Sequence, residues 1–147
     1  MKNLKVEEKV AGKEYVVDAG SLHGMLKRLD LFLVYAAVKF SKEKISCVGM
    51  DPANVAMVYA EVPCKGVNGD FEALINVGSV LPLLSSLSGS ISLTFEKKDD
   101  AYKLTFGNEG GFFTSNCGQV YDAVKVPDLN FAATIKVELA YFRRVLK

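Results

Sequence analysis

Two stretches of this sequence place apolar residues at intervals of three and four, and the segments around them alternate with a period of two. The apolar positions of the first stretch are Leu22, Met25, Leu26, Leu29 and then Phe32 or Leu33. Those of the second are Val80, Leu83, Leu84 and Leu87. This spacing is typical of amphipathic helices, and Ser21 is available as the N-cap of the first. Two short helices set among strands favour a mixed α+β fold.

The remaining segments have the pattern of strands bounded by turn-forming residues. A hairpin of residues 4–10 and 14–18 is predicted at the N-terminus, with its turn at Ala11 and Gly12. Further strands are predicted at residues 34–40, 44–49, 54–62 and 70–76, before the second helix. Residues 91–96, 102–107 and 111–116 follow it and should form an antiparallel meander.

The end of the chain repeats the pattern of its beginning. Residues 130–137 alternate like a strand, and residues 138–147 begin a helix that has no C-cap. One strand and one helix cannot bury a core of their own. We therefore expect an N-terminal extension at residues 1–13, a first domain at 14–117, a linker at 118–128 and the start of a truncated second domain at 129–147.

Charge, cysteine and histidine content argue against several classes of protein. The 18 Lys and Arg nearly balance the 17 Asp and Glu, so any cations that bind nucleic acid must be gathered on one face. Cys47, Cys64 and Cys117 have no C-x-x-C spacing, which argues against a disulfide framework or a zinc site. The single histidine, His23, has no nucleophile near it in the sequence. We expect no catalytic residues, no metal and no cofactor.

Residues Val48 to Pro63 read VGMDPANVAMVYAEVP and resemble a segment of sliding clamps of the proliferating cell nuclear antigen (PCNA) type. In that family a Met-Asp-Pro turn leads into a Val-rich strand that ends before a proline. The resemblance extends over residues 14–147. It implies the α+β DNA-clamp fold, with antiparallel sheets and two amphipathic helices on one face, plus a partial second clamp domain. It also implies a non-enzymatic polymerase processivity factor that encircles duplex DNA, as a homotrimer if full length.

The resemblance further implies that cations on the helices face the DNA. On the first helix these are Lys27 and Arg28. On the last helix they are Arg143, Arg144 and Lys147, which helical offsets group on one side. The second helix carries serines where the family usually carries lysine or arginine, so its contact with phosphate should be weak. The alternative for all of these cations is an ordinary solvated helix face.

A second surface implied by the resemblance is a hydrophobic pocket that receives short peptides from polymerases, ligases and nucleases. The matching positions are Met50, Asn54, Val55, Tyr121, Val124, Val126 and Pro127. Asn54 stands where the family often has histidine, and plain core packing is the alternative for Met50 and Val55. The expected partners are double-stranded DNA, DNA polymerase and other clamp-binding peptides, a clamp loader, and other clamp subunits of the ring.

Two other functions stay open at the level of sequence. One is a clamp-like protein-interaction module that does not encircle DNA. The other, weaker one is an enzyme that uses His23, Asp99 or Asp100. The N-terminus has no apolar signal region and no run approaches the roughly 18 apolar residues of a membrane span. We expect an intracellular protein, cytoplasmic with the DNA in a prokaryote or virus-infected cell and nuclear in a eukaryote.

Overall fold

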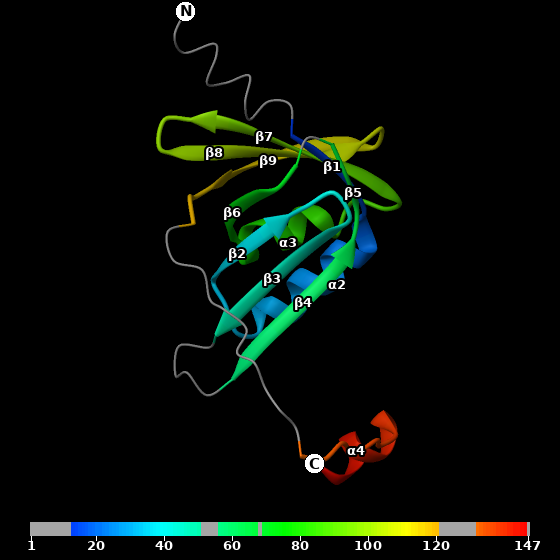
Figure 1. The fold of residues 1–147 in the computed structure, drawn as a ribbon. Coiled ribbons are helices and arrows are strands. Elements are labelled where there is room, and N and C mark those ends of the chain that lie inside the picture. Colours follow the sequence, from blue (N-terminus) through cyan, green and yellow to red (C-terminus); the bar gives the residue numbers. More distant parts are fainter. Residues whose placement is uncertain (1–12, 51–55, 68, 121–131, 147) are drawn as a thin grey trace, which may run out of the picture.

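The computed structural model describes residues 13–50, 56–67, 69–120 and 132–146, and Figure 1 shows its fold. The helices are α2 (Ala19–Asp30), α3 (Val77–Leu84) and α4 (Leu139–Val145). The first strands are β1 (Glu14–Asp18), β2 (Tyr35–Phe40), β3 (Lys44–Met50), β4 (Met57–Pro63), β5 (Lys65–Gly66) and β6 (Phe71–Asn76). The meander consists of β7 (Ser90–Lys98), β8 (Ala101–Asn108) and β9 (Gly111–Cys117). Both amphipathic helices of the first domain and the three-stranded meander are confirmed.

The strands form two antiparallel sheets that are joined at both ends. One sheet has the order β5-β1-β7-β8-β9 and the other β4-β3-β2-β6. The chain passes from β4 in one sheet to β5 in the other after the single residue Cys64. At the opposite end, Gly118 and Leu74 exchange two backbone hydrogen bonds, of 2.8 and 2.9 Å, which tie the end of β9 to β6. The sheets therefore form a nearly continuous layer around the core.

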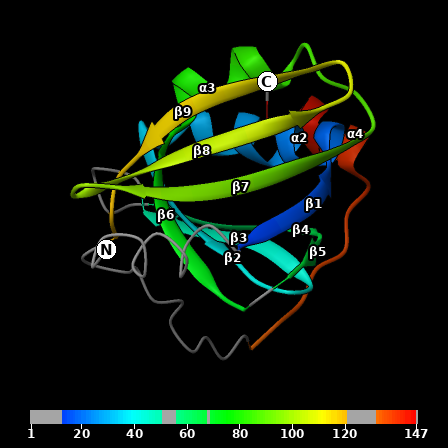
Figure 2. The same ribbon diagram turned by 90° about the horizontal axis from the view of Figure 1, so that it is seen from above.

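Helices α2 and α3 lie next to each other on the same side of this layer, as Figures 1 and 2 show from two directions. The helices face the sheets with their apolar stripes and bury Leu22, Leu26, Val80 and Leu84. Inward residues of both sheets, such as Phe40 and Phe95, complete one core. The α+β class and the placement of the two helices on one face are thus confirmed.

Each of these two helices begins directly after the last residue of a strand, and that strand residue caps the helix. The carboxylate of Asp18 accepts hydrogen bonds from the backbone N–H and the hydroxyl of Ser21, both at 2.9 Å. The side-chain oxygen of Asn76 accepts from the N–H of Ser79 at 3.2 Å. The prediction that Ser21 is the N-cap is therefore wrong. Asp18 takes that place because its extended backbone, with φ −71° and ψ 125°, suits both a strand end and an N-cap.

Asp18→Ala should lower the free energy of unfolding by about 1 kcal/mol, because the first turn of α2 loses its side-chain acceptor. Chemical denaturation of the two proteins measures this difference. Ser21→Ala is the matched control: it removes the hydroxyl but keeps the capping bond from the Ser21 N–H to Asp18. An equal loss in both variants would contradict the assignment of Asp18 as the cap.

The structure tests the sequence expectations for the two ends of the chain. The first half of the expected N-terminal hairpin, residues 4–10, lies outside the described residues, and its second half forms β1, which pairs with β7 on one edge and with β5 on the other at Tyr15 and Val16. The strand over residues 130–137 is wrong for its described part, 132–137, which has no strand and is exposed. The last helix is confirmed as α4, which begins after Glu138.

Candidate nucleic-acid and partner interfaces

The exposed side of α2 carries the first pair of candidate DNA-binding residues. Lys27 and Arg28 lie in its last turn, opposite the buried Leu22, Leu26 and Leu29. Cations at a helix C-terminus interact favourably with the helix dipole. The two ion pairs of the described residues are Lys39 with Asp70 and Lys44 with Glu61, so neither Lys27 nor Arg28 is neutralised there. Both charges remain available to an external anion.

The exposed side of α3 has no charged residue. It consists of Gly78, Ser79 and Pro82, and the exposed Ser85 and Ser86 follow the helix directly. The hydroxyl of Ser85 donates to the carbonyl of Pro82 at 2.6 Å, and that of Ser86 donates to the carbonyl of Leu83 at 2.8 Å. These hydroxyl protons are therefore used within the helix, and the oxygen lone pairs that remain cannot donate to a phosphate. In this geometry the end of α3 is poorly suited to bind an anion.

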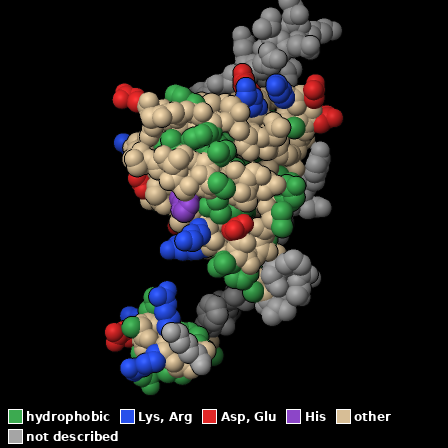
Figure 3. Space-filling view, turned by 180° about the vertical axis from the view of Figure 1, so that it is seen from behind, with side chains coloured by type: hydrophobic (Ala, Val, Ile, Leu, Met, Phe, Trp, Pro, Cys, Tyr) green, Lys and Arg blue, Asp and Glu red, His purple; other side chains and the backbone are tan. Residues whose placement is uncertain are grey.

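Figure 3 shows the molecule from behind the view of Figure 1, with the histidine in purple. Lys and Arg side chains gather beside the histidine, one turn of helix away, since His23 and Lys27 are separated by four residues. Most of the face above them is hydrophobic or uncharged. One group of positive charges on this side of the molecule thus lies near the C-terminal end of α2, and Figure 3 shows others at the upper end of the domain.

Helix α4 holds the second group of candidate cations. Arg143 and Arg144 are exposed, and the guanidinium of Arg144 lies 5.3 Å from the centre of the Tyr141 ring. The apolar residues on α4 are exposed as well, including Leu139 at 60% and Val145 at 64%. Because α4 buries no side chain, its apolar face has no packing partner among the described residues. Lys147 lies outside the described residues.

Of the seven residues expected to form the partner pocket, the structure describes Met50. It is half-buried at the end of β3, where it pairs with Met57 of β4. The other six lie outside the described residues, namely Asn54, Val55, Tyr121, Val124, Val126 and Pro127. The pocket therefore stays an expectation, with one of its residues placed on the sheet.

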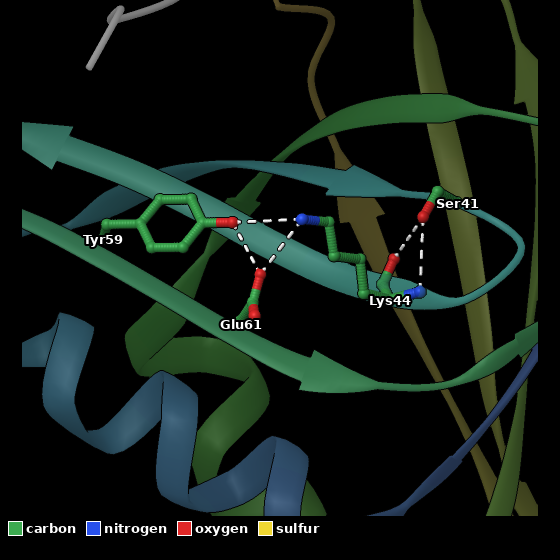
Figure 4. Close-up of polar contacts among 4 residues, drawn as sticks. All are labelled: Ser41, Lys44, Tyr59 and Glu61. Carbon is green, nitrogen blue, oxygen red and sulfur yellow. Dashed lines mark hydrogen bonds and ion pairs between the residues drawn. The ribbon is translucent and has the colours of Figure 1, made fainter. Parts of the chain in front are cut away.

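A polar cluster on the outer side of β3 and β4 was not anticipated from the sequence (Figure 4). The Tyr59 hydroxyl donates to the Glu61 carboxylate at 2.6 Å, and the Lys44 ammonium lies 3.1 Å from the same oxygen. These bonds, led by the one from Tyr59, lower the pKa of Glu61, and the bond to Glu61 raises the pKa of Lys44. The period-2 spacing of Tyr59 and Glu61 within a strand was the signal that could have placed them on one face.

The described residues offer little support for catalytic or metal chemistry. They contain no group of three or more His, Cys, Asp or Glu that could hold a metal ion. Burial raises the pKa of Cys47 and of Cys117 to about 11, so neither thiol is a ready nucleophile at neutral pH. No helix in this part of the chain is long and apolar enough to cross a membrane.

The fold is similar to solved structures of sliding clamps. PCNA of A. fulgidus, solved with the C-terminal region of FEN-1, matches with a TM-score of 0.65 and 16% identity, covering 80% of this chain and 51% of that one. The PCNA2-PCNA3 complex of Sulfolobus tokodaii matches with a TM-score of 0.61 and 18% identity, over 81% and 51%. DNA polymerase III subunit beta of Pseudomonas aeruginosa gives 0.64 and 13%, over 75% and 31%.

No protein-family model and no curated protein matches the sequence. The chain spans between about a third and a half of the length of these solved clamps. At such low identity the likeness concerns the fold, which agrees with the two sheets and the two adjacent helices described above. This chain therefore has the fold of a PCNA-type sliding-clamp domain.

Proposed function

We propose that this chain is a subunit, or a part of a subunit, of a DNA sliding clamp that encircles duplex DNA and catalyses no reaction. The observation that supports this most is the exposed pair Lys27 and Arg28 on α2, beside α3 and on a clamp fold. A closed ring is held on DNA by topology, so it needs only weak contacts to phosphate, which carry no sequence information. The two unpaired cations on α2 suit such contacts.

The rest of the ring follows from the same proposal. Arg143, Arg144 and Lys147 contact DNA from the next domain, and other clamp subunits complete the ring, in a homotrimer for the full-length protein. A clamp loader opens it. DNA polymerase and other replication and repair enzymes bind the pocket that includes Met50. The protein then acts inside the cell, where the DNA is.

Reversing the charge of Lys27 and Arg28 together, by Lys27→Glu and Arg28→Glu, should weaken duplex binding and reduce its dependence on salt. Each lost phosphate contact reduces the slope of log K against log salt by about one, so we expect a change of about two. Fluorescence anisotropy of a labelled duplex at several salt concentrations measures the slope. The control is Lys42→Glu with Lys98→Glu, which reverses two exposed charges, one in the turn between β2 and β3 and one at the end of β7; an equal effect there would contradict the assignment.

Encirclement has its own test. The full-length protein should form a closed oligomer in size-exclusion chromatography with light scattering, and should stay on circular DNA at a salt concentration that releases it from linear DNA. A monomer with equal retention on both DNAs would exclude the ring.

One observation favours a second function, that of a clamp-like interaction module that does not encircle DNA. The exposed side of α3 lacks charge, and the Ser85 and Ser86 hydroxyls donate within the helix. For such a module, charge reversal at Lys27 and Arg28 would leave duplex binding unchanged.

A further inference from the structure

Helices α2 and α4 begin with the same sequence pattern, 120 positions apart, which is the distance between their N-caps Asp18 and Glu138. Both N-caps have an extended backbone, with φ −71° and ψ 125° at Asp18 and φ −66° and ψ 128° at Glu138. Each buried residue from Tyr15 to Leu26 corresponds to an apolar residue 120 positions further on, from Ile135 to Leu146. The two segments are therefore repeats of one unit, with residues that correspond one to one.

The same offset relates the basic residues of the two helices. Lys27 corresponds to Lys147, and His23 corresponds to Arg143. Arg143 is one of the cations that the proposed function places on DNA. His23 thus occupies, on α2, the position at which the second repeat carries a permanent positive charge.

The imidazole of His23 is placed to reach an external anion. His23 is partly exposed and lies four residues before Lys27, so the two side chains are on the same side of α2. Figure 3 shows the histidine on the outer surface, next to Lys and Arg side chains. Within the part of the chain that the structure describes, His23 takes part in no ion pair, and its ring makes no hydrogen bond. Both ring nitrogens are therefore available to a ligand.

The elements packed against α2 place no acidic group opposite His23. These elements are α3, β4 and β1, and α3 has no charged residue. The acidic residues of β4 and β1 are Glu61, Glu14 and Asp18, at exposed positions that alternate with residues packed in the core. Asp18 is bonded to the first turn of α2.

The charged residues of α2 itself are Lys27, Arg28 and Asp30. A proton on His23 adds a third positive charge to a helix with one carboxylate, and Lys27 repels that charge. A phosphate group beside His23 and Lys27 removes this repulsion, because it attracts both cations.

We propose that His23 is a third phosphate contact of α2 and that its proton makes DNA binding stronger as the pH falls. The inference rests on the proposed function, because it assigns the helix face to DNA. A neutral imidazole offers one N–H donor and no charge, whereas the protonated ring is a cation with two donors. Histidine is the side chain that ordinarily makes this change between about pH 5 and 8. The protonated ring releases one more counterion from the duplex, as Lys27 and Arg28 do at every pH.

The test measures duplex binding by fluorescence anisotropy at several salt concentrations, at about pH 8 and about pH 5.5, on either side of the range in which histidine changes charge. For the unsubstituted full chain, the slope of log K against log salt should steepen by about one at the lower pH, because one more phosphate contact forms. The matched variants are His23→Gln, which stays neutral and should keep the shallower slope, and His23→Arg, which should have the steeper slope at both pH values. Thermal unfolding at both pH values checks that each variant is folded.

A second measurement follows the proton itself. His23 is the single histidine of the chain, so proton NMR shows one imidazole side chain. Bound duplex should keep this ring protonated to a higher pH, because protonation and DNA binding strengthen each other by the same factor.

Two results would overturn the role of His23. One is an equal change of slope with pH in the unsubstituted chain and in His23→Gln, and the other is an imidazole titration that duplex does not move. If Lys27→Glu with Arg28→Glu still weakens binding in that case, the clamp function stands without this contact. If the charge reversal leaves binding unchanged at both pH values, the clamp function fails and the inference about His23 fails with it.

Discussion

Phe95→Ala is expected to lower the free energy of unfolding by about 3 to 5 kcal/mol, the range for truncation of a large aromatic residue in a core. Phe95 has no exposed surface. Its ring centre lies 4.9 Å from that of Phe40 and 4.6 Å from that of Phe71, so it joins β7 to both β2 and β6. Its removal would leave a cavity between the two sheets, which the surrounding strands can close only in part.

Urea denaturation monitored by circular dichroism would measure this loss. Phe112→Ala serves as the control, because Phe112 is 64% exposed on β9 and its truncation should change the stability by less than about 0.5 kcal/mol. A Phe95→Ala protein that loses less than about 1 kcal/mol would show that the sheets do not share one core.

Gly107→Ala should destabilise the domain by several kcal/mol or prevent the β8–β9 hairpin from pairing. A Cβ at this position would lie 2.1 Å from the carbonyl oxygen of Gly111 and 2.8 Å from the Cα of Phe112. Both are backbone atoms of β9, so the clash can be relieved only by moving the strand. Gly107 also has a φ of 158°.

The control for this change is Gly89→Ala. Gly89 has a φ of 74°, but an added Cβ would meet no atom within 4 Å. Its cost is then limited to the backbone strain of a left-handed alanine, about 1 to 2 kcal/mol. Thermal unfolding of both variants would compare a steric clash with backbone strain alone. Equal melting temperatures would contradict the close approach of β8 and β9 at Gly107.

Much of this fold could be predicted from apolar periodicity, but the starts of the helices could not. The apolar stripe of α2 begins at Leu22, whereas the helix begins at Ala19. Likewise the stripe of α3 begins at Val80 and the helix at Val77. In each case the capping residue is also the last residue of a strand and has an extended backbone. It therefore fits the period-2 pattern of that strand, and the pattern does not reveal that the residue also caps the helix. Periodicity also left open whether Phe32 or Leu33 faces the core, and the structure shows Leu33 packed against it.

The second feature of the fold that apolar periodicity cannot predict is which strands pair with one another. Residues 132–137 alternate as well as any strand of the sheets, but a strand also needs a neighbouring edge, and the described residues give them none. The two residues of β5 are too few to show a pattern, yet they extend one sheet beside β1. For the candidate sites, helical spacing placed Lys27 and Arg28 on the exposed side of α2, while the pocket depends on residues 51–55 and 121–131, beyond the described part.

The double hydrogen bond between Gly118 and Leu74 determines how a mechanical load enters the domain. A pull on the chain beyond Gly118 acts on these two bonds, and so on β6 as well as along β9. Strand β6 leads directly into α3 through the cap at Asn76. Tension on the segment that follows the domain is therefore shared between the meander, through the covalent bond to Cys117 of β9, and the strand that leads into α3.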